Sequence, residues 1–177
     1  LAHACMEPMN TTAHFKGDSV EIWSPTQAQS WGQHAVSQLT GLPPKAITVH
    51  ATYLGGGFGR RLDVDYIVEA VDVSRAAGNV PVKVVWTRED DIQNAVYRPA
   101  SHNVMQAALD AKGALIAWRH RIVGASILQY FKTFGHFLRK DGLDPTSVQG
   151  AADYFPYDIP NVYVDYINNN PGVPSGF

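Results

Sequence analysis

The sequence predicts an α+β domain in which mixed sheets are packed against helices. Between residues 20 and 86, segments of alternating hydrophobicity and segments of helical periodicity follow one another in the order strand, helix, strand, glycine loop, helix, strand. From residue 101 onward, two β-prone stretches joined by a turn predict a long antiparallel ribbon. A hydrophobic share of 45% in 177 residues is enough to supply one core.

The first half of the alternating unit lies between residues 20 and 54. Val20–Trp23 is a short strand pattern. The segment Ser24–Gln27 that follows has a capping serine, a first-turn proline and a glutamine three residues after the serine, which predicts that a helix begins there. The predicted apolar face of this helix consists of Ala28, Trp31, Ala35 and Leu39. Alternation over Ala46–Leu54 then predicts a half-buried strand, with Ile47, Val49, Ala51 and Tyr53 on one face.

The second half of this unit begins with the glycine-rich segment Gly55–Gly59. A helix is predicted after it, with aspartates in the first turn, an arginine in the last and Gly78 at its end. Its apolar stripe consists of Leu62, Tyr66, Ile67, Ala70 and Val71. Val80–Trp86 is another strand pattern, and Thr87 with Asp90 three residues later predicts a short capped helix.

The ribbon is predicted from His102–Leu109 and Ala114–Val123. The intervening Asp110–Gly113 is a turn of the longer type, with a glycine available for positive φ. Ser126–Lys140 has helical spacing but an interior glycine, so it is either a helix or an insertion. Val162–Ile167 is the last predicted strand.

Charge and composition exclude several classes of protein. The chain has 14 Lys plus Arg against 16 Asp plus Glu and no basic stripe, so we do not expect it to bind nucleic acid. Its 17% of charged residues is below the roughly 25% usual for soluble domains, which favours burial against other protein surfaces. Cys5 is the single cysteine, so the chain alone cannot form a disulfide or an iron–sulfur site. Its seven histidines lack ligand-type spacing, and no protein-ligated metal is predicted.

The glycine loop is the first candidate site. Four glycines in Gly55–Gly59 let the backbone approach an anion closely, but the loop matches neither the dinucleotide nor the phosphate-loop pattern. Taken alone it is equally a structural turn, although Phe58, an aromatic residue between glycines, favours a functional loop. Arg60 and Arg61 could neutralise an oxyanionic ligand, or could be an exposed pair facing the aspartates that follow.

Other reactive residues have structural interpretations. His3 and Cys5 alone do not indicate nucleophilic catalysis, because the sequence shows neither a distant partner histidine nor an oxyanion hole. A buried structural cysteine is therefore the favoured interpretation. Glu7 is either a base or an anchor for loop amides, and anchoring is the preferred interpretation. Three aromatic residues either line a pocket for a flat substrate or pack over the core, the second being favoured; they are Tyr154, Phe155 and Tyr157.

Three segments together resemble one family. They are His3–Ala13 (His-Ala-Cys-Met-Glu-Pro-Met-Asn-Thr-Thr-Ala), Ser24–Gln27 and Leu54–Arg61 (Leu-Gly-Gly-Gly-Phe-Gly-Arg-Arg). Their order and approximate spacing are similar to those of the molybdenum-binding large subunit of the xanthine oxidase/aldehyde oxidase family. The branch that they resemble most contains the isoquinoline 1-oxidoreductase beta subunit and membrane-associated aldehyde dehydrogenases. The resemblance implies that residues 1–177 are a first molybdopterin-binding domain, a fragment of a longer subunit.

The resemblance also implies a cofactor. This is molybdopterin carrying molybdenum, in bacteria commonly the cytosine dinucleotide form, held by backbone amides without a metal ligand from the protein. The predicted cofactor contacts are Gly56, Gly57, Phe58, Gly59 and Arg60. The implied partners are the other domains of the large subunit and a small iron–sulfur subunit with 2Fe-2S clusters, with a cytochrome among the candidate electron acceptors.

The implied activity is oxidation of an N-heteroaromatic compound or an aldehyde, with water as the source of oxygen. Leu62 stands where many relatives have a glutamate that can hold a purine, which places xanthine low among the substrates. The family's glutamate base belongs to a segment that this chain does not match, so no catalytic residue is predicted here and the isolated chain should be inactive. Two alternatives stay open: a non-catalytic phosphate- or nucleotide-binding module that uses Gly55–Gly59, and a purely structural domain. The compartment also stays open, between the bacterial cytoplasm and a periplasmic or membrane-associated location.

Overall fold

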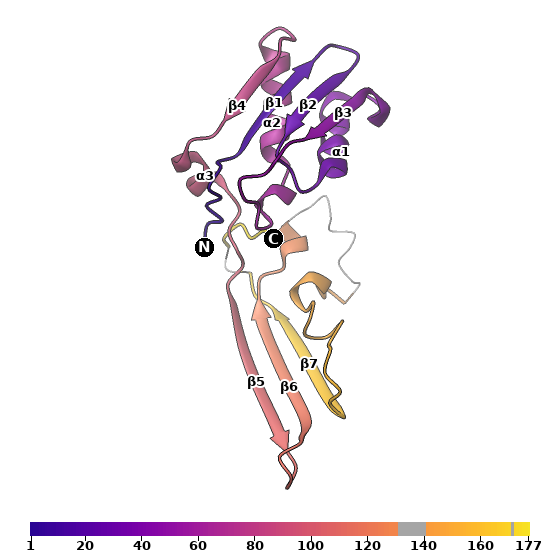
Figure 1. The fold of residues 1–177 in the computed structure, drawn as a ribbon, viewed down its shortest axis with the longest axis vertical. Coiled ribbons are helices and arrows are strands. Elements are labelled where there is room, and N and C mark those ends of the chain that lie inside the picture. The colour runs from indigo at the N-terminus through magenta and orange to yellow at the C-terminus, as the bar shows by residue number, and fades with distance from the viewer. Residues whose placement is uncertain (131–140, 171) are drawn as a thin grey trace. The chain divides into compact units, whose positions relative to one another are not determined.

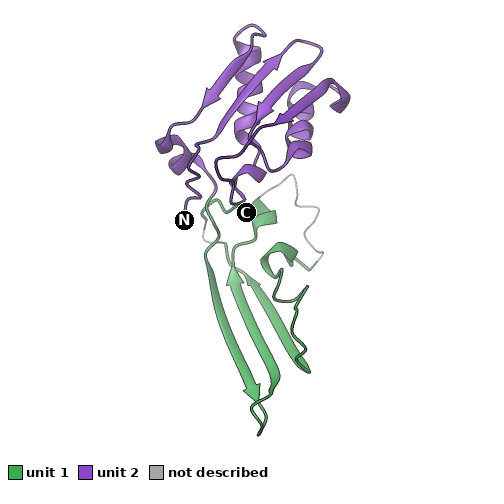
Figure 2. Ribbon diagram, viewed as in Figure 1, with its two compact units in different colours: residues 1, 97–176 green, residues 2–96, 177 purple. Residues whose placement is uncertain are grey.

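The computed structural model describes residues 1–130, 141–170 and 172–177. The chain forms two compact units, residues 2–96 with Phe177 and residues 97–176 with Leu1 (Figure 2). Each unit is built on one sheet, as Figure 1 shows. This mixture of sheets and helices confirms the predicted fold class. Among the described residues, no helix is long and apolar enough to cross a membrane.

The first unit contains a four-stranded mixed sheet with the strand order β3-β2-β1-β4. The strands are β1 (Asn10–Phe15), β2 (Val20–Ser24), β3 (Ile47–Ala51) and β4 (Val82–Val85). β1 pairs antiparallel with β2 and β4, and β2 pairs parallel with β3. The sequence did not predict β1, because its polar and small residues show no apolar alternation. Its Thr11 is fully buried, and the hydroxyl is hydrogen-bonded to the Ser24 hydroxyl and to the carbonyl oxygen of Asn10, both at 2.8 Å.

Two helices pack on this sheet, α1 (Gln29–Thr40) and α2 (Asp65–Ala76) (Figure 1). Together with the N-terminal segment they enclose the core, whose buried members are Cys5, Met9, Ala13, Val20, Ile22, Val36, Ile47, Tyr66, Ile67, Ala70 and Val71. The predicted stripe of α2 is confirmed by the complete burial of its four helical members. Leu62 lies before the helix, in the 3₁₀ turn Arg60–Leu62.

The predicted start of α1 is wrong by four residues. Its N-cap is Ala28, without a side-chain hydrogen bond, and Ser24 is instead the last residue of β2. The hydroxyl that would cap the helix is already bonded to Thr11. Thr26 takes over part of this role, since its Oγ1 accepts the N–H of Ala28 at 3.0 Å.

Two predicted apolar faces are less buried than expected. In α1 the fully buried residues are Gly32 and Val36, while the predicted Trp31, Ala35 and Leu39 are half-buried. In the following strand Ile47 is buried, but Ala51 and Tyr53 are exposed. This strand is at the edge of the sheet and ends at Ala51, so Tyr53 lies beyond the paired residues.

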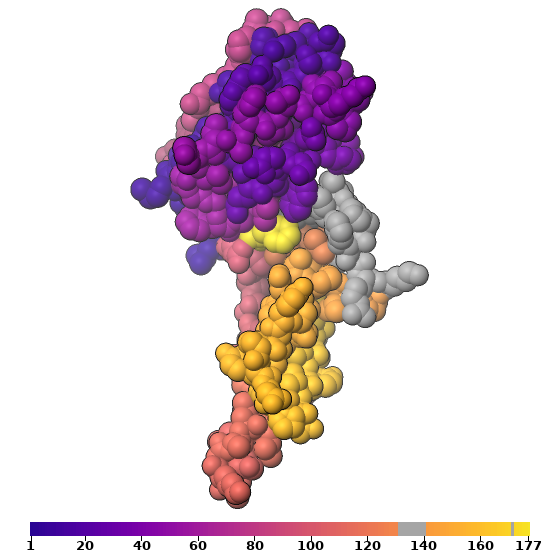
Figure 3. All heavy atoms as spheres, turned by 45° about the vertical axis from the view of Figure 1, so that its right-hand side comes forward, coloured from indigo at the N-terminus to yellow at the C-terminus, as the bar shows by residue number. Residues whose placement is uncertain are grey.

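The second unit contains a three-stranded sheet with the strand order β5-β6-β7. β5 (Ser101–Leu109) and β6 (Leu115–Gly124) form the predicted antiparallel ribbon, and β7 (Asn161–Asn168) pairs parallel with β6. The turn between β5 and β6 is also as predicted, with Gly113 at a φ of +82°. The tip of this hairpin extends beyond the paired part of β7 (Figure 3).

The remaining helical segments are short. α3 (Arg88–Asn94) begins with the predicted capping box, in which Thr87 and Asp90 each accept the other's backbone N–H. α4 covers Ile127–Tyr130, which is the start of the predicted segment Ser126–Lys140. The rest of that prediction lies outside the described residues. Two further 3₁₀ turns are Pro44–Ala46 and Pro145–Ser147.

Candidate functional site

The three motif segments singled out in the sequence meet in the first unit around one buried side chain, that of Arg61. Its Nη2 donates to the carbonyl oxygen of Glu7 at 2.8 Å and to the Glu7 carboxylate at 2.9 Å. Nη1 donates to the carbonyl oxygen of Pro25 at 3.1 Å, and Nε to that of Gly56 at 2.7 Å. One guanidinium therefore connects the N-terminal segment, the segment after β2 and the glycine loop.

Glu7 holds the start of the glycine loop. Its Oε2 accepts the N–H of Gly55 at 2.8 Å, its own N–H donates to the carbonyl of Gly55 at 3.0 Å, and its Oε1 accepts from Asn10 at 2.9 Å. Burial raises the pKa of Glu7, but these hydrogen bonds and the charge of Arg61 outweigh it and hold the pKa below its ordinary value of 4.5. The structure confirms the interpretation of Glu7 as an anchor.

The glycine loop adopts a conformation that needs glycine. Gly56 and Gly59 have φ values of +98° and +97°, and a Cβ at Gly57 would collide with the side chain of Gln27. That side chain also accepts the N–H of Gly59 at 3.1 Å. Phe58 has a φ of +53°, a strained value for a residue with a side chain, and its ring is 69% exposed. The loop thus presents an exposed aromatic ring on a strained backbone.

Three consecutive backbone N–H groups of this loop have no hydrogen-bond partner in the part of the chain that the structure describes. They belong to Gly56, Gly57 and Phe58. The amides on either side are engaged, that of Gly55 by Glu7 and that of Gly59 by the side chain after β2. Consecutive unpaired amides can bind an anion or the polar edge of a cofactor.

Arg60 makes contacts different from those of its neighbour. Its Nη1 and Nη2 donate to the two carboxylate oxygens of Asp65 at 2.9 and 2.8 Å, and its guanidinium lies 5.8 Å from the ring centre of Tyr66 and 5.4 Å from that of Trp86. The alternative of an exposed arginine pair is wrong, because both side chains are fully buried. Beside this contact, burial and the charge of Asp65 raise the pKa of Asp63 to about 6. Contact between Arg60 and a cofactor stays a prediction.

Cys5 and His3 have structural roles. Cys5 is fully buried, its Sγ lies 3.5 Å from the carbonyl oxygen of Gly57, and burial raises the pKa of the thiol. His3 is hydrogen-bonded through Nδ1 to the carbonyl of Val96 at 3.1 Å and through Nε2 to that of Phe177 at 2.5 Å. A thiol held in its protonated form is a poor nucleophile, so the preferred interpretation is confirmed.

Sequence reasoning missed Arg88. Its guanidinium donates to the carbonyl oxygens of Cys5 and Met6 and to the buried carboxylate of Asp91. More than 80 residues separate Arg88 from the motif that it holds. The only sequence signal was its position as the first residue after the Thr87 cap. Within the described ranges, no group of three or more His, Cys, Asp or Glu residues could hold a metal ion.

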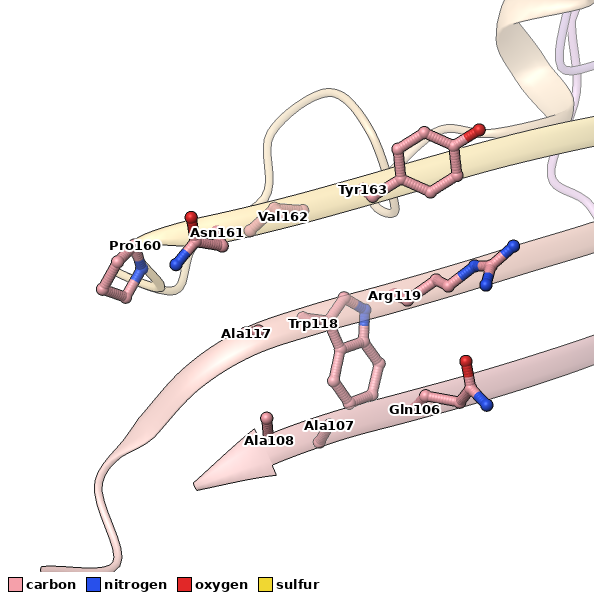
Figure 4. Close-up of a pocket in the computed structure, with 10 residues that line it drawn as sticks. All are labelled: Gln106, Ala107, Ala108, Ala117, Trp118, Arg119, Pro160, Asn161, Val162 and Tyr163. Carbon is pink, nitrogen blue, oxygen red and sulfur yellow. The ribbon is translucent and has the colours of Figure 1, made fainter. Parts of the chain in front are cut away.

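A separate cavity lies on the sheet of the second unit (Figure 4). It has a volume of about 520 Å³, and the polar side chains along it are Gln106, Arg119 and Asn161. The indole Nε1 of Trp118, which also lines it, is buried without a hydrogen-bond partner among the described residues. None of the predicted cofactor contacts lines this cavity.

The predicted aromatic cluster does not line that cavity either. Tyr154 and Tyr157 are exposed, and Phe155 packs edge to face against Tyr157 at 5.4 Å between ring centres. The favoured interpretation of packing over the core is therefore wrong for the two exposed tyrosines, and the contact that the structure shows is between Phe155 and Tyr157.

The convergence of the three motif segments agrees with a match to a known family. A family model described as the molybdopterin cofactor-binding domain matches residues 1–168. The chain belongs to this family. The resemblance seen in the motif segments is therefore confirmed.

Curated relatives of this molybdopterin cofactor-binding domain include two bacterial oxidoreductases. The chain is 33% identical over 169 residues to isoquinoline 1-oxidoreductase subunit beta of Brevundimonas diminuta, over 92% of this chain and 20% of the relative. It is 36% identical over 117 residues to membrane-bound aldehyde dehydrogenase (pyrroloquinoline-quinone) of Gluconacetobacter polyoxogenes, over 66% of this chain and 15% of the relative. The chain thus spans a fifth or less of the length of these relatives.

The fold of this molybdopterin cofactor-binding domain is also found in a solved structure. The aldehyde oxidoreductase from Desulfovibrio gigas superposes with a TM-score of 0.74 at 19% identity, over 98% of this chain and 18% of that one. At this identity the comparison supports the fold alone, and it confirms the mixed α/β architecture.

Proposed function

We propose that the chain supplies part of the molybdopterin site of a molybdenum hydroxylase. The observation that carries this proposal is the run of three amides at Gly56, Gly57 and Phe58 that have no partner among the described residues, next to an exposed aromatic ring. Backbone donors of this kind fit a cofactor rich in polar edges and phosphate oxygens. Gly59 completes the contact surface, and Arg60 supports it by donating its backbone N–H to the carbonyl of Gly57 at 2.8 Å.

The whole enzyme that we propose converts a C–H bond of its substrate and one water molecule into a C–OH group, two protons and two electrons. The molybdenum cofactor supplies the two-electron redox chemistry when it is bound. The residues of this chain bind and orient the cofactor, and the catalytic base comes from another part of the large subunit. The electrons leave through an iron–sulfur subunit with 2Fe-2S clusters. The names of the relatives, an oxidoreductase subunit and a dehydrogenase, support an oxidation of the substrate, and the family match supports the molybdopterin cofactor.

The proposed substrates are N-heteroaromatic compounds and aldehydes, the classes that appear in the names of the relatives. Leu62 is half-buried in the 3₁₀ turn after the loop and offers no hydrogen bond to a purine. The proposed cofactor is the cytosine dinucleotide form. Residues 1–177 act as one cofactor-binding part of a longer subunit and are inactive alone, since the base and the electron-transfer clusters lie elsewhere.

The alternative of a nucleotide-binding module that uses the arginine pair is not favoured. Arg60 and Arg61 have no exposed surface, and their guanidinium groups are bonded within the chain. A free phosphate would therefore meet only the loop amides, without the basic pair on which that alternative depended.

The test of the proposal is replacement of Phe58 by alanine in the full large subunit assembled with its iron–sulfur partner. We expect turnover per enzyme to fall about tenfold or more, because a misplaced reacting group costs rate steeply, and molybdenum retention to fall with it. Tyr53→Ala is the matched control, since Tyr53 is also an exposed aromatic residue near the loop. Wild-type molybdenum content and turnover in Phe58→Ala would contradict the proposal.

A further inference from the structure

We infer that Arg61 and Glu7 form a positioning pair that sets the direction of the cofactor-facing amides of the glycine loop. This inference rests on the proposed function of that loop. Neither residue is assigned as a cofactor contact, and both act through the backbone of Gly55 and Gly56.

The argument starts from the planarity of the peptide bond. Because the six atoms of a peptide group lie in one plane, fixing a carbonyl group also fixes the N–H of the next residue, which points the opposite way. Each of the three unpaired N–H groups belongs to a peptide whose carbonyl oxygen is held. The carbonyl of Gly55 accepts from the N–H of Glu7 at 3.0 Å, that of Gly56 from Arg61 Nε at 2.7 Å, and that of Gly57 from the N–H of Arg60 at 2.8 Å.

The pair therefore acts on two of the three amides. Glu7 fixes the peptide that carries the N–H of Gly56 through the carbonyl oxygen of Gly55, and its carboxylate also holds the preceding peptide by accepting the N–H of Gly55. Arg61 fixes the peptide that carries the N–H of Gly57. Glycines have little conformational preference of their own, so these external bonds determine where the two donors point.

The geometry of Arg61 explains why an arginine is suited to this position. Its planar guanidinium reaches Gly56, Pro25 and Glu7 at the same time. Its three nitrogen atoms donate four hydrogen bonds in total. The side chain is fully buried, so these acceptors replace water. A lysine keeps the charge, but its single ammonium group cannot span the three segments.

The test compares Arg61→Lys and Glu7→Gln in the full-length subunit with its iron–sulfur partner. Ser74→Ala is the control for a loss of stability alone. Ser74 is buried in the same unit and bonds to the N–H of Phe15 at 3.0 Å and the carbonyl of Val80 at 2.7 Å, without contact to the loop. The readouts are hydrogen exchange of residues 54–59 in subunit produced without cofactor, and kcat and KM per bound molybdenum in loaded enzyme.

Within residues 54–59 the hydrogen-bonded amides of Gly55 and Gly59 are the ones that can lose protection. We expect their exchange to speed up at least tenfold in cofactor-free Arg61→Lys, and by less in Glu7→Gln, which keeps an acceptor for the loop. In loaded enzyme we expect kcat per bound molybdenum to fall about 10²-fold in Arg61→Lys, with little change in KM, because an ångström of misplacement costs about that factor. Ser74→Ala should lower the melting temperature but leave both readouts at the wild-type value.

The outcomes separate this inference from the proposed function. If Arg61→Lys and Glu7→Gln fold and both exchange and turnover stay at the wild-type values, the positioning pair is wrong while the cofactor site stands. If wild-type subunit contains no molybdenum, the proposed function is wrong, and the exchange measurement on cofactor-free protein still decides whether the pair orders the loop. Should Arg61→Lys fail to fold, the milder Glu7→Gln carries the test, and wild-type exchange and turnover in it overturn the inference.

Discussion

At the scale of single residues, the candidate site depends on one buried positive charge, that of Arg61, whose hydrogen-bond partners all belong to the protein. The guanidinium of Arg61 is surrounded by three backbone carbonyl oxygens and one carboxylate. Removing one partner from such a buried contact leaves polar groups that are hydrogen-bonded neither to water nor to the protein, which lowers the stability of the fold. The partly exposed Glu7 is the partner that can be titrated, so the site should respond to pH.

The first residue-scale prediction concerns acid stability. The folded-state pKa of Glu7 lies below its ordinary value of 4.5, so the ionised carboxylate stabilises the fold. This contribution is fully present above pH 4.5 and is lost as the pH falls through the lower, folded-state pKa. We expect the melting temperature of the full subunit to drop less between pH 7 and pH 4 in Glu7→Gln than in the wild type.

A matched variant sharpens this measurement. Glu21 also has a lowered pKa, through its hydrogen bonds with Lys16 and His50, but both of these partners are exposed side chains, whereas the Arg61 partner of Glu7 is fully buried. Glu21→Gln should leave the acid dependence close to that of the wild type. Equal slopes for wild type and Glu7→Gln between pH 7 and pH 4 would show that the Glu7 carboxylate does not stabilise the fold.

At the scale of elements, α1 and α2 pack against each other and form the helical layer that covers the four-stranded sheet. A Cβ added at Gly32 in α1 would lie 3.1 Å from Cδ1 of Ile67 in α2, tighter than an ordinary van der Waals contact. Since Ile67 is fully buried in the core, it has little room to move. The glycine therefore permits the helices to pack closely, although glycine costs stability in a helix.

The element-scale prediction follows from this contact. We expect Gly32→Val to destabilise the first unit by about 1–3 kcal/mol, because overpacking forces side chains and backbone apart. Thermal denaturation of the full subunit measures this change. Ser30→Val is the control, as residue 30 is exposed on the same helix and carries the same cost of a β-branched side chain. A Gly32→Val variant as stable as Ser30→Val would show that the helices can separate freely.

Prediction from sequence succeeded where an apolar pattern carried the information. α2, the ribbon and the capping box before α3 follow from periodicity and local turn chemistry, and their positions in the structure agree. β1 and the start of α1 were missed together, for one reason. Ser24 was predicted as a helix cap and no strand was predicted at Thr11, but their hydroxyls bond to each other across β1 and β2.

The site was predictable in its segments and not in its contacts. The glycines, Phe58 and Glu7 could be singled out because their residue types are unusual for a simple turn. The burial of Arg60 and Arg61 could not, because most acceptors of Arg61 are backbone carbonyls, which no residue type reveals. Arg88 was hidden by its distance along the chain from the N-terminal motif.

At the scale of the whole molecule, the chain is two compact units, and the candidate site lies within the first. The family match covers residues 1–168, and therefore parts of both units. The chain spans a fifth or less of its curated relatives, which supports our proposal that it works as part of a longer subunit. On that proposal, the role of this part of the subunit is to hold backbone N–H donors in fixed positions for the cofactor.

The most direct test of the central claim is hydrogen exchange of residues 54–59 in the wild-type full subunit, with and without the molybdenum cofactor. The amides of Gly56, Gly57 and Phe58 have no partner among the described residues, so they should exchange rapidly without cofactor. We predict strong protection of this segment when the cofactor is bound, while α2 exchanges equally in both forms. Equal exchange of residues 54–59 in the two forms would contradict the assignment of this loop to the cofactor site.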